Sequence, residues 1–174
     1  MAYAIELFFN EQADTAVRRV WHRLAVSGLP SLETLGHRRH RPHVSLTVLE
    51  TAQPPAVADV EDLVDVWRLP ALHFSALGTF GGGGGVLFLA PVVTEPLLAV
   101  HARLNDVLQE QGIAQWPHYL PGSWVPHCTL AMNLTPAELS AAAGLLAGFR
   151  QLRAEVAEVG VTDTETGDTT VLNR

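Results

Sequence analysis

A short pattern that joins a proline, a histidine and a hydroxyl side chain occurs twice in the chain. It is Pro42-His43-Val44-Ser45-Leu46 in the first half and Pro126-His127-Cys128-Thr129-Leu130 in the second. Successive side chains of an extended strand point to opposite faces, so each motif places its imidazole and its hydroxyl on one face. The intervening apolar side chains then point the other way. Each motif therefore predicts a strand with one chemical face and one buried face.

Two histidines can form an acid and base pair for a displacement at phosphorus. One imidazole takes a proton from the nucleophile and the other gives a proton to the leaving oxygen, since histidine exchanges protons near neutral pH. The hydroxyls of Ser45 and Thr129 can donate hydrogen bonds to the non-bridging phosphate oxygens, where charge develops in the transition state. The motifs thus indicate a metal-independent catalytic set of His43, Ser45, His127 and Thr129. They leave open which histidine is the base.

A metal site is the competing interpretation of the histidine-rich region. His37, His40 and His43 have a spacing that could place metal ligands on one face of a helix. Pro42 disfavours a helix at that point, because the residue before a proline is pushed out of the helical region. A metal-dependent hydrolase therefore ranks below the paired-histidine hypothesis.

The charge balance argues against a broad basic surface for long nucleic acids. The chain has 174 residues and a formal net charge of −7, whereas binding along a nucleic acid needs many contacts between basic side chains and phosphates. Recognition of a phosphate should therefore be local. The concentrated positive segment is His37-Arg38-Arg39-His40-Arg41, directly before the first motif. Arg39 and Arg41 are candidate substrate-binding residues, and a solvated surface run is the alternative.

The distribution of apolar residues does not predict a membrane segment. The longest stretch without acidic or basic residues, 69–94, is split by Gly81–Gly85 into two runs that are too short to span a bilayer. The first apolar run contains Glu6 and no basic residue precedes it, unlike a signal peptide. We expect a cytoplasmic protein without a membrane partner. Its single cysteine excludes an internal disulfide.

The elements around the motifs follow the same order in both halves. For the first half, apolar spacing predicts a strand over 4–9, a helix from 13 to about 28, the motif strand over 43–49, a helix over 57–67 and a strand over 72–80. For the second half it predicts a strand over 86–93, a helix from 94, the motif strand over 125–132, a helix from the capping box at Thr135 to about 149, and a hairpin over 156–162 and 169–172.

This repeated order predicts an α+β fold. The motif histidines lie 84 residues apart, close to half the chain length. We expect residues 1–174 to form a single two-lobed domain with a pseudo-twofold arrangement of two antiparallel sheets. The sheets should line a central cleft, with the helices packed on the outside.

The segment before the second motif contains side chains suited to a nucleotide. Trp116, Tyr119 and Trp124 surround a stretch rich in proline and glycine, and an aromatic ring there could stack on a nucleobase. We select Trp124, next to the motif, as the stacking residue. Tyr119 and His118 are further candidate substrate-binding residues. Packing beneath a loop is the alternative for each ring.

The paired His-x-Ser/Thr-Leu motifs resemble those of the two-histidine (2H) phosphoesterase superfamily. Within it, the chain is most similar to the bacterial 2′-5′ RNA ligase and cyclic phosphodiesterase branch, and the segment 124–131 carries the likeness most specifically. The resemblance implies that His43, Ser45, His127 and Thr129 are catalytic and that no cofactor is needed. It also implies action on 2′,3′-cyclic phosphates of nucleotides or RNA ends, or on related cyclic phosphodiesters. Some relatives join RNA ends through 2′-5′ linkages.

Two positions depart from the RNA ligase-type relatives. Ala131-Met132 follow the second motif where those relatives often carry a basic residue, and Ser45 stands in place of a threonine but keeps the hydroxyl. We therefore favour hydrolysis of a small cyclic phosphodiester over RNA end-joining. The alternative is a catalytically silent nucleotide- or RNA-binding module with the same cleft. The motifs leave the physiological substrate and the oligomeric state open.

Overall fold

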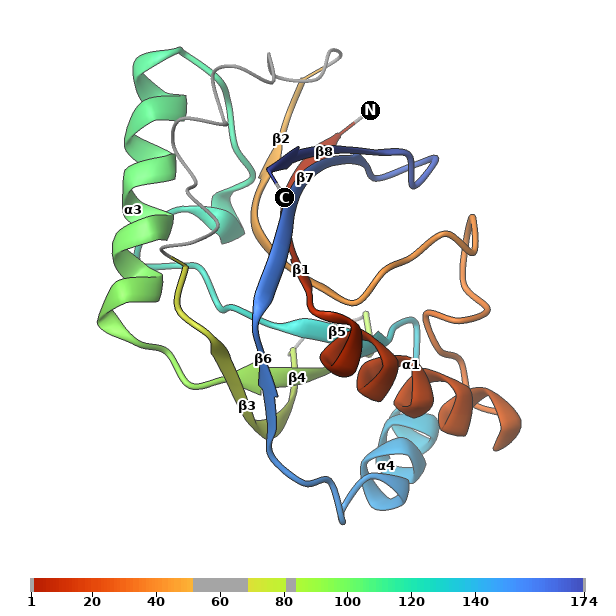
Figure 1. Ribbon diagram of the computed structural model, residues 1–174. Coiled ribbons are helices and arrows are strands. Elements are labelled where there is room, and N and C mark those ends of the chain that lie inside the picture. The colour runs from red at the N-terminus through yellow and green to blue at the C-terminus, as the bar shows by residue number, and fades with distance from the viewer. Residues whose placement is uncertain (1, 52–68, 81–83, 174) are drawn as a thin grey trace.

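Two antiparallel sheets make up most of the described structure (Figure 1). The computed structural model describes residues 2–51, 69–80 and 84–173. The strands are β1 (Tyr3–Phe9), β2 (His43–Leu49), β3 (Leu72–Thr79), β4 (Leu87–Pro91), β5 (Cys128–Ala131), β6 (Leu152–Ala154), β7 (Val156–Asp163) and β8 (Thr169–Asn173). The helices are α1 (Glu11–Val26), α3 (Glu95–Glu110) and α4 (Pro136–Leu145). The predicted α+β class is confirmed.

The two halves of the chain exchange strands between the sheets. The strand orders are β2-β1-β7-β8 and β5-β4-β3-β6. Each motif strand lies at the edge of its sheet, beside the first strand of its own half of the chain. The next strand along, β7 in the first sheet and β3 in the second, comes from the other half. The pseudo-twofold arrangement therefore holds, and each sheet contains strands from both halves of the chain. A short connection makes β3 and β4 neighbours, which draws β3 into the second sheet.

Several element boundaries differ from the predicted ones. Strand β5 begins at Cys128, and His127 immediately precedes it. The strand starts later than expected because Pro126 has no N–H to donate to a ladder. Helix α4 ends at Leu145, earlier than expected, in a region where glycines weaken the helix. Strand β6 was not predicted, since three residues are too few to show an alternating pattern. The helix expected over 57–67 lies outside the described residues.

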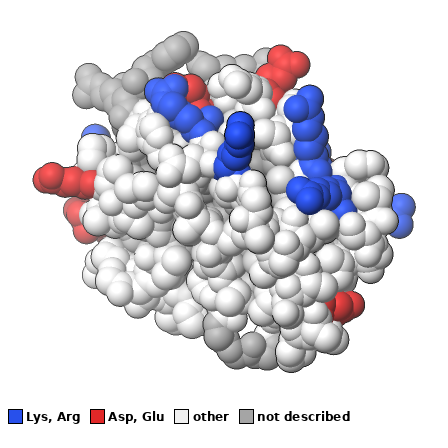
Figure 2. All heavy atoms as spheres, turned by 90° about the horizontal axis from the view of Figure 1, so that it is seen from below, with Lys and Arg blue, Asp and Glu red and all other residues white. Residues whose placement is uncertain are grey.

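Charged side chains are spread over the surface. Figure 2 shows arginine side chains in several separate groups on one face, with acidic residues on the same face. They form no continuous basic surface on the part of this face that the structure describes. This distribution agrees with the acidic net charge of −7.

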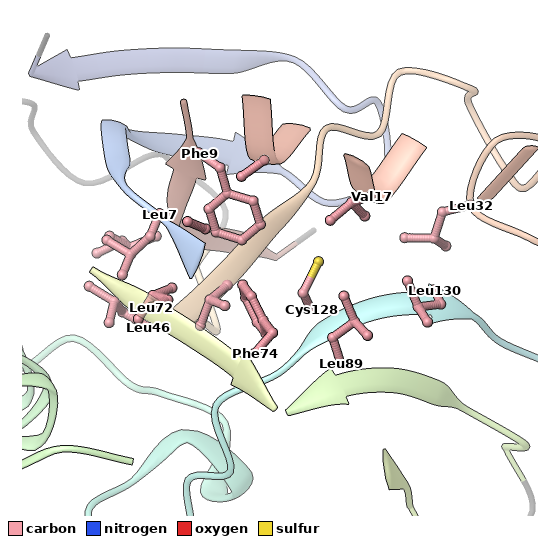
Figure 3. Close-up of a cluster of buried hydrophobic side chains, with 14 of the residues drawn as sticks. Leu7, Phe9, Val17, Leu32, Leu46, Leu72, Phe74, Leu89, Cys128 and Leu130 are labelled. Atoms are coloured by element: carbon pink, nitrogen blue, oxygen red, sulfur yellow. The ribbon is translucent and has the colours of Figure 1, made fainter. Parts of the chain in front are cut away.

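The back of each motif strand is buried in one hydrophobic cluster. Val44, Leu46, Cys128 and Leu130 are all fully buried, which confirms the predicted apolar face of both motifs. Figure 3 shows side chains of both sheets meeting in this cluster, from strands β1, β2, β3, β4 and β5. Burial raises the pKa of the Cys128 thiol to about 12. The thiol is therefore a neutral core group.

Helix α1 packs against both sheets. Asn10 caps its first turn, and its buried stripe consists of Ala13, Val17, Trp21 and Leu24. The helix contacts β1 of the first sheet and both β5 and β6 of the second. At the start of α4, Thr135 and Glu138 form the predicted capping box. No helix in the described part of the chain is both long and apolar enough to cross a membrane.

Candidate active site

The motif strands β2 and β5 contact each other, and a cleft lies where the two sheet edges meet. The cleft has a volume of about 240 Å³. Its lining includes Glu6 and Phe8 of β1, His43 and Ser45 of β2, Thr129 of β5, Thr162 and Thr169 of β7 and β8, Trp116, Tyr119 and Met132, and His37, Arg39, His40 and Arg41 of the segment before β2. Three of the four proposed catalytic side chains therefore line one cavity.

The two motif imidazoles are fixed by the same local contact. Nδ1 of His43 lies 2.6 Å from the carbonyl oxygen of Arg41, and Nδ1 of His127 lies 2.8 Å from the carbonyl oxygen of Val125. A carbonyl oxygen can only accept, so each contact requires the proton on Nδ1. In both rings Nε2 is therefore the nitrogen left to exchange a proton with a substrate.

His127 lies in an apolar environment beside the cleft. Its ring centroid is 4.8 Å from that of Phe80 and 5.3 Å from that of Phe88. Burial lowers the pKa of His127, the Val125 carbonyl opposes this, and the charge of His43 lowers the pKa further. The interaction with His43 means that the two rings lie near each other, although His127 is not among the cavity-lining residues. A neutral imidazole here is suited to accept a proton.

His43 has a charged neighbour in addition to an aromatic one, the Phe8 ring, whose centroid lies 6.2 Å from that of the imidazole. Its Nε2 is 3.2 Å from Oε1 of Glu6. Ser45 follows two residues later on the same strand, and the Tyr119 hydroxyl hydrogen-bonds to the Ser45 side chain. Burial, and then the negative charge of Glu6, raise the pKa of Tyr119. The phenol therefore stays protonated beside the cleft.

Two tryptophans from opposite halves support the motif strands. Nε1 of Trp124 donates to the Ser45 carbonyl at 3.0 Å, and Nε1 of Trp21 donates to the Thr129 carbonyl at 3.1 Å. An edge strand leaves backbone groups that its own ladder cannot satisfy. Each indole therefore satisfies an edge carbonyl in the motif of the other half.

The position of Trp124 corrects our expectation that its ring stacks on a nucleobase. The residue is only 9% exposed, and its ring stacks on His101 with centroids 4.0 Å apart. It is not among the cavity-lining residues. His118 is exposed in a single turn of 3₁₀-helix over Pro117–Tyr119 and also lies outside the lining. Tyr119 does line the cleft, as expected.

The basic segment lies at the cleft, as its position before the motif suggested. Nη2 of Arg41 is 2.8 Å from Oε2 of Glu158, and its guanidinium lies over the Phe8 ring at 4.1 Å. Arg39 forms an ion pair with Asp168. The acidic side chains of β7 and of the β7-β8 turn thus hold both arginines at the cleft. An anionic substrate would compete with these carboxylates for the guanidinium groups.

Glu6 and Trp116 are among the cavity-lining residues that the predicted set lacked. Glu6 is the one ionisable residue in the otherwise apolar stretch Ala4–Phe9, and a charge in a buried strand could have indicated it. Trp116 lines the cleft and is 42% exposed; its position near the second motif had indicated an aromatic ring there, but we selected Trp124 instead. Across the described residues, no group of three or more histidine, cysteine or acidic side chains is arranged to hold a metal ion.

We predict that Trp124→Phe lowers the free energy of unfolding by about 1 kcal/mol, because the Ser45 carbonyl loses its donor while most of the ring volume remains. Urea unfolding measures the change. Trp116→Phe is the matched control, since that ring is 42% exposed. Equal unfolding free energies for the two variants would show that the indole contact does not stabilise the motif strand.

We also predict that His40→Gln reduces the loss of folding stability at acid pH. Burial, and then the charges of His37 and His43, lower the pKa of His40 from 6.5 to about 4. Between these pH values the unfolded chain binds the proton more readily, so His40 reduces stability as the pH falls from about 6.5 through 4.

The variant should therefore keep more of its neutral-pH stability at about pH 4.5 than the parent does. Urea midpoints at both pH values measure this. His73→Gln, at an exposed position of β3, is the control and should match the parent. The same acid loss in parent and His40→Gln would contradict the prediction.

The comparisons with known proteins give a family. Residues 11–168 match the 2′-5′ RNA ligase superfamily. Among curated protein sequences, none matches the chain significantly. Solved structures of Kluyveromyces marxianus Usb1 are similar over 99% of this chain and 98% of theirs: one with uridine monophosphate, at 13% identity and a TM-score of 0.46, and another at 12% identity and a TM-score of 0.48. Since the family match covers most of its length, the chain belongs to the 2′-5′ RNA ligase superfamily, as its paired motifs predicted.

Proposed function

We propose that this protein is a metal-independent phosphodiesterase that hydrolyses 2′,3′-cyclic phosphates of nucleotides or RNA ends. The observation that carries the proposal is the equivalent fixation of His43 and His127, each through Nδ1 on the carbonyl two residues earlier. Two imidazoles that present Nε2 and two neighbouring hydroxyls supply the groups that acid and base catalysis at phosphorus needs. Membership of the 2′-5′ RNA ligase superfamily supports the same chemistry.

In this mechanism a water molecule attacks phosphorus while one imidazole removes its proton. The bond from phosphorus to one ribose oxygen breaks, and the other imidazole gives that oxygen a proton. Ser45 and Thr129 donate hydrogen bonds to the non-bridging oxygens, where negative charge increases. The Trp124 and Trp21 contacts keep the backbone of both hydroxyl residues in place.

The cleft suits a small substrate. Its volume of about 240 Å³ is slightly below the range of about 300–1,000 Å³ that is usual for ligand pockets. It can hold a cyclic phosphate and part of a nucleoside, and the rest of a longer substrate would lie outside. Trp116 replaces Trp124 as our candidate for stacking on the base, because it lines the cleft and its ring is exposed.

We predict that His43→Ala and His127→Ala each lower kcat/KM for 2′,3′-cyclic nucleotides by about 10²–10⁴-fold, because each removes one proton-transfer group. Turnover is measured over a panel of the four nucleotides in the presence of a chelator. His118→Ala is the matched control, since this histidine is exposed outside the cleft. Full activity of either motif variant would contradict the mechanism. Tight binding by the parent without turnover would favour the silent binding module.

We further predict that Trp116→Ala raises KM about 10-fold and changes kcat little, because stacking on an exposed ring contributes about 1–3 kcal/mol per base. Steady-state kinetics with the preferred cyclic nucleotide measure both constants. Trp116→Phe should restore most of the affinity, since it keeps an aromatic face. Unchanged KM in Trp116→Ala would place the base elsewhere.

A further inference from the structure

Glu6 is a buried acid in the wall of the cleft. Its side chain is 8% exposed, and its neighbours Ile5 and Leu7 on β1 are fully buried. An ionised carboxylate is costly to bury unless partners compensate its charge and accept its hydrogen bonds. The contacts of Glu6 therefore show what holds it there.

Both carboxylate oxygens of Glu6 have a partner from a neighbouring strand. Oε1 lies 3.2 Å from Nε2 of His43 on β2. Oε2 accepts a hydrogen bond of 2.7 Å from the Thr162 hydroxyl on β7, which lies 2.9 Å from the Thr169 hydroxyl on β8. All four strands of the first sheet thus fix the carboxylate against the motif imidazole.

The Glu6 contact is with Nε2, the second nitrogen of the His43 ring. Nδ1 already needs its proton for the Arg41 carbonyl, so Nε2 of a neutral ring would turn a lone pair toward the carboxylate. The 3.2 Å contact is an ion pair only when the ring also carries a proton on Nε2. An ionised carboxylate therefore favours a proton on Nε2 of His43.

His127 has no equivalent acid among its contacts in the described residues. Its ring lies against Phe80 and Phe88, and Nδ1 donates to the Val125 carbonyl. The two motifs are alike in sequence and in the fixation of Nδ1, but they differ in what surrounds the imidazole. One ring is placed to hold a proton, and the other is placed to receive one.

The other ionisable groups near His43 do not supply this negative charge. Tyr119 and His40 are held neutral by burial. Arg41 is cationic and its charge is met by Glu158. His127 supplies no negative charge, and the charge of His43 contributes to its lowered pKa. Among the described residues, Glu6 is the carboxylate in contact with the His43 ring.

We propose that Glu6 is a positioning residue that keeps a proton on Nε2 of His43 and so makes His43 the acid and His127 the base. The inference rests on the function proposed above. Water gives its proton to Nε2 of His127 as its oxygen bonds to phosphorus. The bond from phosphorus to the leaving ribose oxygen breaks, and that oxygen takes the proton from Nε2 of His43. The product is a phosphate monoester, and Glu6 takes no part in the proton transfers.

The test uses a leaving group that needs no acid. The products of the parent reaction first identify the ribose oxygen that leaves, and a second substrate then carries sulphur at that position. Because a thiolate leaves without a proton, loss of the acid matters little for this substrate, whereas loss of the base matters for both. The variants are Glu6→Gln, His43→Ala and His127→Ala, with Glu110→Gln at the exposed end of α3 as the matched control.

We expect Glu6→Gln to lower kcat for the oxygen substrate about 10²-fold with little change in KM, and to lower it less than about 5-fold for the sulphur substrate. His43→Ala should show the same rescue, and His127→Ala should stay impaired on both substrates. Glu6→Asp, which keeps the charge, should recover part of the activity. Thermal unfolding checks that each variant is folded.

Three results would overturn the inference. Glu6→Gln could be as active as Glu110→Gln, it could be impaired equally on both substrates, or the sulphur substrate could rescue His127→Ala instead of His43→Ala. Each of these leaves the proposed function standing. A parent protein that turns over neither substrate would contradict the proposed function as well, so the two failures are distinguishable.

Discussion

The site depends on the meeting of two sheet edges, β2 and β5. An edge strand exposes backbone groups without ladder partners, and a buried carbonyl left without a donor costs about 1–3 kcal/mol. Here Trp124 and Trp21 satisfy one carbonyl in each motif strand. The backbone of His43 also hydrogen-bonds with the Cys128 thiol of the opposite strand. These contacts bring two motifs from distant parts of the chain to the same cleft and keep their hydroxyl residues in place.

The motifs are repeated, but their surroundings are not. Both imidazoles are oriented by a carbonyl two residues earlier, which follows from the local conformation of each motif. Beyond this contact, His43 meets a buried carboxylate and His127 meets two phenylalanine rings. A symmetric pair of motifs can therefore support an asymmetric reaction, because burial and neighbouring charge control proton transfer. The environment of each ring, rather than its motif, distinguishes the acid from the base.

The parts of the structure that the sequence could predict are those with local or periodic causes. The motif strand at 43–49, the capping box at Thr135 and the burial of Leu46 and Leu130 all follow from neighbouring residues. The exchange of β3 and β7 between sheets depends on pairing over long distances. The contacts of Glu6 with Thr162 and of Trp21 with Thr129 join residues 156 and 108 positions apart. Such partners have no local pattern, which is why Trp124 was expected to face the substrate and Glu6 was missing from the predicted site.

The central claim is that both motif histidines act on one phosphate. A crystal structure with a nucleoside 2′- or 3′-monophosphate, the product of the proposed reaction, tests it most directly. We predict a phosphate that accepts hydrogen bonds from Nε2 of both His43 and His127, with the Ser45 and Thr129 hydroxyls on its remaining oxygens. A phosphate held by Arg39 and Arg41 alone, without contact to either imidazole, would contradict the account.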